Sequence, residues 1–313
     1  MKKMLVVVPT AAQVHSAPGL RRAFKDACQV RKYAMKSFRC QLGVLSRPEG
    51  SAVCQLGKTK VVAAVFGPRP PQGSTDTDTE LATVVVEYRQ GLSSCPLSIQ
   101  TLESDTISTG LQFAGGESDE QRWAPSRGRA TLSETERRFA AALTRSLECV
   151  IARTEYPRLQ FWVYIWVLEE GGSELALATT AAWAACLDAG VALVDALVGV
   201  SVAVNATPGY AGTEQTCIAF PTSEEEASAH EGRLWVALLP NLGLTADLQW
   251  RGATSQRRRD DSTVDDIRAP ESFSKAFCCA QQAAVAMYPI LREQLVAQLG
   301  EKKPSATSAW FTA

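Results

Sequence analysis

The sequence has few of the residues that hold metals or build disulfide frameworks. Only His15 and His230 stand among 313 residues, and the nine cysteines include no CxxC pair. Because structural zinc sites draw on histidine and on closely spaced cysteines, we expect neither a metal site nor any other cofactor. The odd number of cysteines favours a reducing compartment over a secreted, cross-linked scaffold.

An excess charge of one sign and long apolar runs are also missing. The 32 basic and 33 acidic residues give a net charge of −1, so any patch that attracts nucleic acid is local. The N-terminal run MLVVV is closed by Pro9 and is too short for a secretion signal. No other run is long and apolar enough to span a bilayer, so we expect a soluble intracellular protein that makes no membrane contact.

The chain divides into one large patterned segment and two flanking tails. We interpret residues 1–37 as an N-terminal tail or docking arm, 38–300 as a single domain, and 301–313 as a C-terminal tail. Stretches near 90–125 and 251–270 lack a sustained hydrophobic period, which is typical of exposed insertions.

Strands and helices alternate through this domain, which predicts a mixed α/β architecture. Ser133 and Glu136 form a capping box ahead of an apolar stripe, and an Ala-rich helix follows Gly171 and Gly172. A last helix contains Pro289, where we expect a kink. The segments with β-type patterning are 51–56, 59–66, 80–89, 158–170, 195–204, 213–220, 233–240 and 244–250.

Four blocks of sequence carry a resemblance to a known family. They are GVLSRPEGSAVCQLGKTKVVAAVFGP, the segment 136–204, RLWVALLPNLG and AMYPILREQL. In this order, with G-G-S ahead of an Ala-rich helix that ends D-A-G, they resemble the RNase PH family over roughly residues 40–298. Within the family the chain is most similar to the RNase PH-like ring subunits of the eukaryotic RNA exosome.

The resemblance implies a fold and a set of partners. The fold is a mixed α+β structure of two pseudo-repeated βαβα halves, of the ribosomal S5 domain 2-like type. The expected partners are other RNase PH-like exosome subunits in a hexameric ring, S1/KH-type cap proteins, and single-stranded RNA threaded through the central channel. The expected location is the nucleus, including the nucleolus, and the cytoplasm.

Active members of this family cleave RNA with inorganic phosphate, and the resemblance implies a phosphate cradle at the start of the Ala-rich helix. A helix N-terminus offers free amide donors and a positive dipole end. The family adds a Ser or Thr and an Arg after two glycines. Here Gly171, Gly172 and Ser173 match, but Glu174 stands at the arginine position. We therefore interpret the site as degenerate, with Ser173 as an N-cap and Glu174 as a first-turn stabiliser of the helix dipole.

The acidic group of active members is also missing from its expected place. Ala219 or Phe220 occupies the position where the family has an aspartate. The following Glu224, Glu225 and Glu226 are candidates for metal ligands, but three consecutive carboxylates on a loop are more typical of a solvated surface. These two losses predict that the chain is not an enzyme.

Contact with RNA does not require catalysis, because basic side chains at a channel mouth suffice to bind phosphates. The candidate RNA contacts are Arg69, Arg89, Arg127 and Arg129, with Arg69 as the first choice; the alternative for each is a surface ion pair. The sequence thus favours a non-catalytic ring subunit. An active phosphorolytic 3'-5' exoribonuclease, or a like-folded subunit of another assembly, remains as an alternative.

Overall fold

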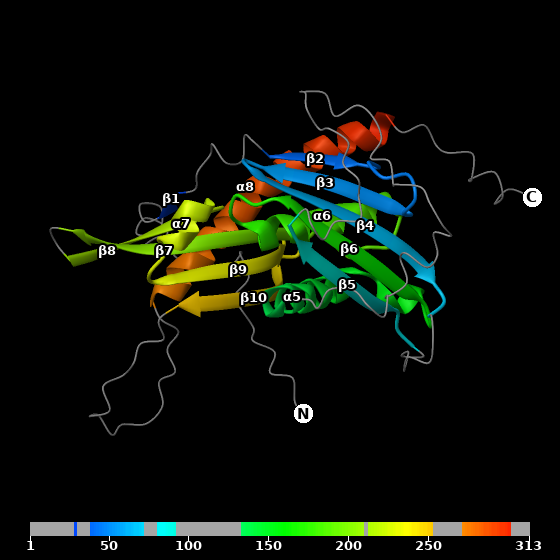
Figure 1. Cartoon of the computed structure of the whole chain (residues 1–313), viewed down its shortest axis with the longest axis horizontal. Helices are drawn as coiled ribbons and strands as arrows, with labels where there is room; N and C mark the ends of the chain where they lie inside the picture. Colours follow the sequence, from blue (N-terminus) through cyan, green and yellow to red (C-terminus); the bar gives the residue numbers. More distant parts are fainter. Residues whose placement is uncertain are drawn as a thin grey trace, which may run out of the picture.

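Two five-stranded sheets form the frame of the molecule, and the Ala-rich helix lies between them (Figure 1). The computed structural model describes residues 28–29, 38–71, 80–91, 133–209, 212–252 and 271–301. Most of the predicted N-terminal arm, most of both insertions and the C-terminal tail beyond 301 lie outside these ranges. So do Arg127 and Arg129.

The first sheet has the order β2-β3-β4-β6-β5, with β5 parallel to β6 and the other neighbours antiparallel. The predicted hairpin between β3 and β4 is present, and Gly57 supplies the positive φ of +59° that its turn requires. The strands of the first sheet are β2 (Arg39–Leu42), β3 (Gly50–Leu56), β4 (Thr59–Arg69), β5 (Thr83–Gln90) and β6 (Gln160–Glu169).

The second sheet has the order β1-β8-β7-β9-β10. All its neighbours are antiparallel except β1, a short strand that pairs with β8 in parallel. Its strands are β1 (Cys28–Gln29), β7 (Val198–Gly209), β8 (Gly212–Ala219), β9 (Gly232–Leu239) and β10 (Leu244–Gly252). The remaining elements are the helices α5 (Glu134–Val150), α6 (Glu174–Asp188), α7 (Ser223–Ala227) and α8 (Glu271–Glu301), with the short 3-10 helix η2 (Arg153–Glu155) after α5.

Helix α6 is buried on all sides, as its Ala-rich sequence predicts. Two glycines let the sheets approach it closely. A Cβ at Gly50 of β3 would lie 2.3 Å from the carbonyl oxygen of Ala185, and a Cβ at Gly199 of β7 would lie 2.2 Å from that of Ala176. Because both contacts are with helix backbone, a side chain at either glycine would push a sheet away from α6.

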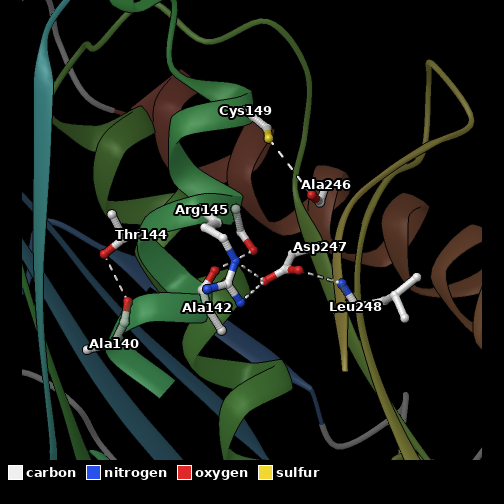
Figure 2. Close-up of polar contacts among 9 residues, drawn as sticks. Ala140, Ala142, Thr144, Arg145, Cys149, Ala246, Asp247 and Leu248 are labelled. Atoms are coloured by element: carbon white, nitrogen blue, oxygen red, sulfur yellow. Dashed lines mark hydrogen bonds and ion pairs between the residues drawn. The ribbon is translucent and has the colours of Figure 1, made fainter. Parts of the chain in front are cut away.

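Helix α5 begins at the predicted capping box, in which Ser133 and Glu136 bond each other's backbone amides. The helix belongs to the first half of the chain but is tied to β10 of the second. Arg145 Nη2 lies 2.7 Å from Asp247 Oδ2, and the Cys149 thiol faces the carbonyl of Ala246 (Figure 2). Helix α8 continues through Pro289 and runs from the second sheet to β2 (Figure 1). No described helix is both long and apolar enough to cross a membrane.

Candidate functional site

The turn that joins β6 to α6 carries the predicted Gly-Gly-Ser sequence. Gly172 has φ +100°, and a Cβ there would lie 2.5 Å from the carbonyl oxygen of Pro221, so no other residue fits. Ser173 adopts the left-handed conformation, with φ +59°, and is 2% exposed. Its hydroxyl donates to the Pro221 carbonyl at 2.9 Å and does not cap the helix. Ser173 is thus the N-cap residue of α6 by position, as the sequence predicts, but its side chain takes no part in the cap.

Carboxylates of the chain itself bind the amides at the start of α6. The Gly172 N–H donates to Glu174 Oε1 at 3.0 Å, and the Ser173 N–H donates to Glu226 Oε1 at 2.8 Å. The Ser173 N–H is one of the free donors that a helix N-terminus offers to an anion, and the Gly172 N–H lies in the turn just before it. The start of α6 is thus an anion site whose anions are two glutamates of the same chain.

Glu226 differs from the solvated glutamate that the sequence predicts. Thr222 and Glu225 form a capping box that starts α7, and this turn directs Glu226 towards α6 while Glu224 stays exposed. Burial and the nearby charge of Glu174 raise the pKa of Glu226. They outweigh the hydrogen bond from Ser173 and the attraction of Arg233, which lower it.

The glutamates line one wall of a cleft of about 100 Å³ between α6, α7 and the second sheet. Ser201, Trp235 and Gln249 line the cleft from β7, β9 and β10, and Phe139 of α5 lies at its border. The Trp235 side chain is 6% exposed, and its indole N–H has no hydrogen-bond partner. A small polar molecule that entered the cleft would meet groups of both charges.

Two arginines on neighbouring strands supply the positive charge of the cleft. Arg233 and Arg251 are direct partners in the β9–β10 register, and both line the cleft. Partial burial lowers the pKa of Arg251, and the charges of Arg138 and Arg233 lower it further. Sequence analysis missed this pair, although cross-strand pairing of the predicted strands 233–240 and 244–250 could have suggested it.

The expected position of the family's aspartate is apolar in the structure. Ala219 is 1% exposed and Phe220 is 5% exposed, and neither brings an acidic group to the cleft. Among the described residues, no cluster of three or more His, Cys, Asp or Glu side chains is arranged to hold a metal ion.

The described candidate RNA contacts have different surroundings. Arg69 is exposed at the end of β4, where its guanidinium lies 2.7 Å from Glu49 and over the Phe66 ring. Arg89 is 7% exposed and pairs with Glu87 at 3.0 Å, so a phosphate could not reach it without opening the structure. The burial argues against Arg89 as an RNA contact, whereas Arg69 stays a candidate.

Comparison with known proteins places this geometry in a family. The family model described as "RNase_PH: 3' exoribonuclease family, domain 1" matches residues 34–192. The chain belongs to the RNase PH family. Within that family it is 31% identical to the human exosome complex component MTR3 over 299 residues, covering 91% of this chain and 88% of that protein.

Other relatives agree with this family assignment. The chain is 27% identical to the exosome complex component Rrp41 of Pyrobaculum calidifontis over 261 residues, covering 83% of this chain and 85% of that protein. The crystal structure of rice Rrp46 superposes with a TM-score of 0.57 at 20% identity, over 82% of this chain and 94% of the rice chain. The RNase PH-like fold predicted from the sequence is therefore confirmed.

Proposed function

We propose that this chain is a non-catalytic structural subunit of an RNA exosome ring. In this role it forms part of the channel that threads RNA, and so supports 3'-to-5' RNA processing and degradation. Its similarity to exosome components supports the assembly. The observation that carries the loss of catalysis is that Glu174 and Glu226 accept the amide hydrogens of Gly172 and Ser173.

The glutamates oppose phosphate through both geometry and charge. A phosphate at the start of α6 would compete with them for the same N–H groups. Two unit charges of the same sign about 4 Å apart repel by about 4 kcal/mol at an effective dielectric of 20, or about a thousandfold in affinity. The dipole of α6 thus stabilises the chain's own carboxylates and offers little to an attacking phosphate.

Exposed apolar residues at one end of the second sheet are candidates for contact with a ring neighbour. Val194, Leu242 and Leu244 are 58%, 49% and 52% exposed. Asp195 brings the first two together because its carboxylate accepts the N–H of Leu242 at 2.9 Å. In the proposed ring, other RNase PH-like subunits cover such surfaces, S1/KH-type proteins cap the ring, and the assembly works in the nucleus, including the nucleolus, and in the cytoplasm.

The proposal is tested by incubating the chain with single-stranded RNA and inorganic phosphate, with and without Mg²⁺. We expect no shortening of the RNA and no nucleoside diphosphates, whether the chain is alone or in its reconstituted ring with the other subunits made inactive. Phosphate-dependent release of nucleoside diphosphates that is lost on Ser173→Ala would instead show the alternative, an active phosphorolytic exoribonuclease.

A further inference from the structure

Two buried thiols face each other on neighbouring strands of the first sheet. Cys40 of β2 and Cys54 of β3 are direct partners in the antiparallel register, and their sulfur atoms are 3.3 Å apart. Cys40 is 2% exposed and Cys54 is fully buried. The pair lies far along the chain from the start of α6, and the proposed function makes no use of it.

The hydrogen bonds around Cys40 show which kind of cross-strand pair this is. The N–H and the carbonyl of Cys40 point away from β3, because both bond to side chains of α8. Along the same register, the Gly43 N–H donates to the Ser51 carbonyl at 2.8 Å. Cys40 and Cys54 therefore form a non-hydrogen-bonded pair, in which Cα atoms lie about 4.5 Å apart. That separation falls within the range that a disulfide accepts, about 4.4–6.8 Å.

Two glutamines of α8 bond to the backbone of the strand that carries Cys40, and we call them the glutamine clamp. Gln294 accepts the Cys40 N–H at 2.8 Å and donates to the Phe38 carbonyl at 2.9 Å. Gln298 accepts the Leu42 N–H at 2.8 Å and donates to the Cys40 carbonyl at 2.6 Å. Gln294 and Gln298 are separated by a helical rise of about 6 Å, and Cys40 and Leu42 by a strand rise of about 6.7 Å. The spacing of the two glutamines therefore matches the spacing of the N–H groups along the edge of β2.

The surroundings of the two thiols disfavour the thiolate form of Cys54. Cys54 donates a hydrogen bond to Cys40, and this bond together with burial raises its pKa well above the ordinary value. Oxidants react with the thiolate, so a protonated and buried thiol reacts slowly. Separation of β2 from α8 would expose Cys40 to solvent while it remains paired with Cys54.

We propose that Cys40 and Cys54 are a redox-sensitive pair that a hydroperoxide converts into a cross-strand disulfide, with the glutamine clamp limiting the rate. In the first step, Cys40 sulfur attacks one oxygen of hydrogen peroxide, the O–O bond breaks, and a sulfenic acid and water form. In the second step, Cys54 sulfur displaces the hydroxyl group as a second water. The two thiols lose two electrons in total, and the peroxide takes them up.

A disulfide would change what holds β2 in place. In the reduced chain β2 depends on its ladder with β3 and on the clamp, whereas in the oxidised chain a covalent bond joins it to β3. Oxidation would therefore keep β2 in the first sheet even when α8 moves away. The disulfide is reversible by thiol exchange, so the change is a switch and not damage.

Peptide mapping tests the proposal on the full-length chain. The folded protein is treated with hydrogen peroxide, alkylated under denaturing conditions and digested with trypsin. Because Arg47 precedes Pro48, residues 40–58 stay in one peptide that contains both cysteines. We expect this peptide to appear unalkylated, with a mass two hydrogen atoms below that of the reduced peptide. Reduction with dithiothreitol followed by alkylation should convert it to the doubly alkylated form.

Variants of the clamp test its control of access. Replacing Gln294 and Gln298 together with alanine should speed formation of the disulfide peptide at least tenfold, whereas Gln282→Ala, at an exposed site on the same helix, should leave the rate unchanged. If the double variant does not fold, the wild-type rate measured in increasing urea below the unfolding transition replaces it, and this rate should rise with urea.

Three results would overturn the proposal. One is that the 40–58 peptide stays doubly alkylated at peroxide concentrations that oxidise the exposed Cys149. Another is that Cys40 accumulates sulfinic acid, or forms a disulfide with a cysteine other than Cys54. A rate unaffected by the clamp variant and by urea would also contradict it, because access would then not depend on β2.

Discussion

Glu226 accepts the backbone N–H of Ser173 at 2.8 Å across a separation of 53 residues. This bond joins α7 to the start of α6 and places a negative charge where the family resemblance implies a bound phosphate. It also creates a local conflict, because Glu174 carries a second negative charge to the same turn.

Glu226→Gln should make the protein more stable at neutral pH. The pKa of Glu226 is higher in the folded chain than its ordinary value, so the folded state binds more protons between these two pKa values. Stability from this group is therefore present below the ordinary pKa and is lost as pH rises through the raised one. Glutamine still accepts the Ser173 N–H without a charge.

Urea unfolding from pH 4 to 8 measures this effect. The free energy of unfolding of the variant, relative to that of wild type, should increase as pH rises. Glu224→Gln, an exposed control on α7, should show no such trend.

Glu136→Gln should have the opposite pH dependence. Burial alone would raise the pKa of Glu136, but hydrogen bonds from Ser133 and Gln90 and the charge of Arg89 lower it overall. Its stabilisation is present above the ordinary pKa and is lost as pH falls through the lowered one. Glutamine keeps the capping box but not the charge, so we expect a loss of stability at neutral pH that shrinks in acid. A loss that stays constant down to the acid transition would contradict this account.

Restoring positive charge at the start of α6 should restore phosphate binding. In a Glu174→Arg, Glu226→Gln double variant both glutamate charges are gone, and a guanidinium stands at the position where the family resemblance implies one. Phosphate should then raise the melting temperature of the double variant but not that of wild type. Sulfate should act similarly and chloride at equal ionic strength should not. An equal response of the two proteins would show that the glutamates do not exclude phosphate.

Arg69→Gln in a reconstituted complex should weaken RNA binding without disturbing assembly. Each phosphate contact releases about one counterion, so the log–log salt slope should become shallower by about one. Lys58→Gln, which precedes the opposite end of β4 and is also exposed, is the matched control. If Arg69 serves only its ion pair with Glu49, RNA affinity and salt slope will equal those of wild type.

Gly199→Ala should destabilise the chain by about 1–3 kcal/mol, the usual cost of overpacking a core. The added methyl group would lie 2.2 Å from the Ala176 carbonyl oxygen, and helix backbone cannot move aside as a side chain can. Urea denaturation measures the loss. Ser201→Ala, at the next position on the same face of β7, should stay close to wild type. A Gly199→Ala protein as stable as wild type would mean that α6 and β7 are not tightly packed.

Local patterns predicted the parts of the fold that depend on neighbouring residues. Ser133 and Glu136 are three residues apart and form the predicted cap, and the Ala-rich run after Ser173 forms the predicted buried helix. The features that sequence analysis missed depend on residues far apart in the chain. The bond between Glu226 and Ser173 requires α7 to lie against α6, which no local pattern encodes.

Charge alone was also a poor guide to exposure. Arg89 and Glu226 are both charged and lie near predicted turns or strand ends, yet Arg89 is buried beside Glu87 and Glu226 turns inward to an amide donor. Buried charges occur where a partner compensates the loss of water, and partners are set by tertiary structure. The prediction that the Gly-Gly-Ser-Glu sequence is degenerate rests on a local pattern, because Glu174 directly follows the residues that match the family resemblance.

The position of α6 has a consequence for synthesis on the ribosome. The family match called domain 1 ends at residue 192, so α6 emerges with the first sheet, but one of its faces packs against β7 and β9, which follow it in the chain. A nascent chain that has left the ribosome only up to this boundary would present a bare alanine surface to solvent. Because that surface is covered only after β9 has been made, the two halves cannot mature one after the other. A pause in translation when residue 192 has just left the ribosome should therefore leave a form that chaperones hold, and completion of the second half should release it.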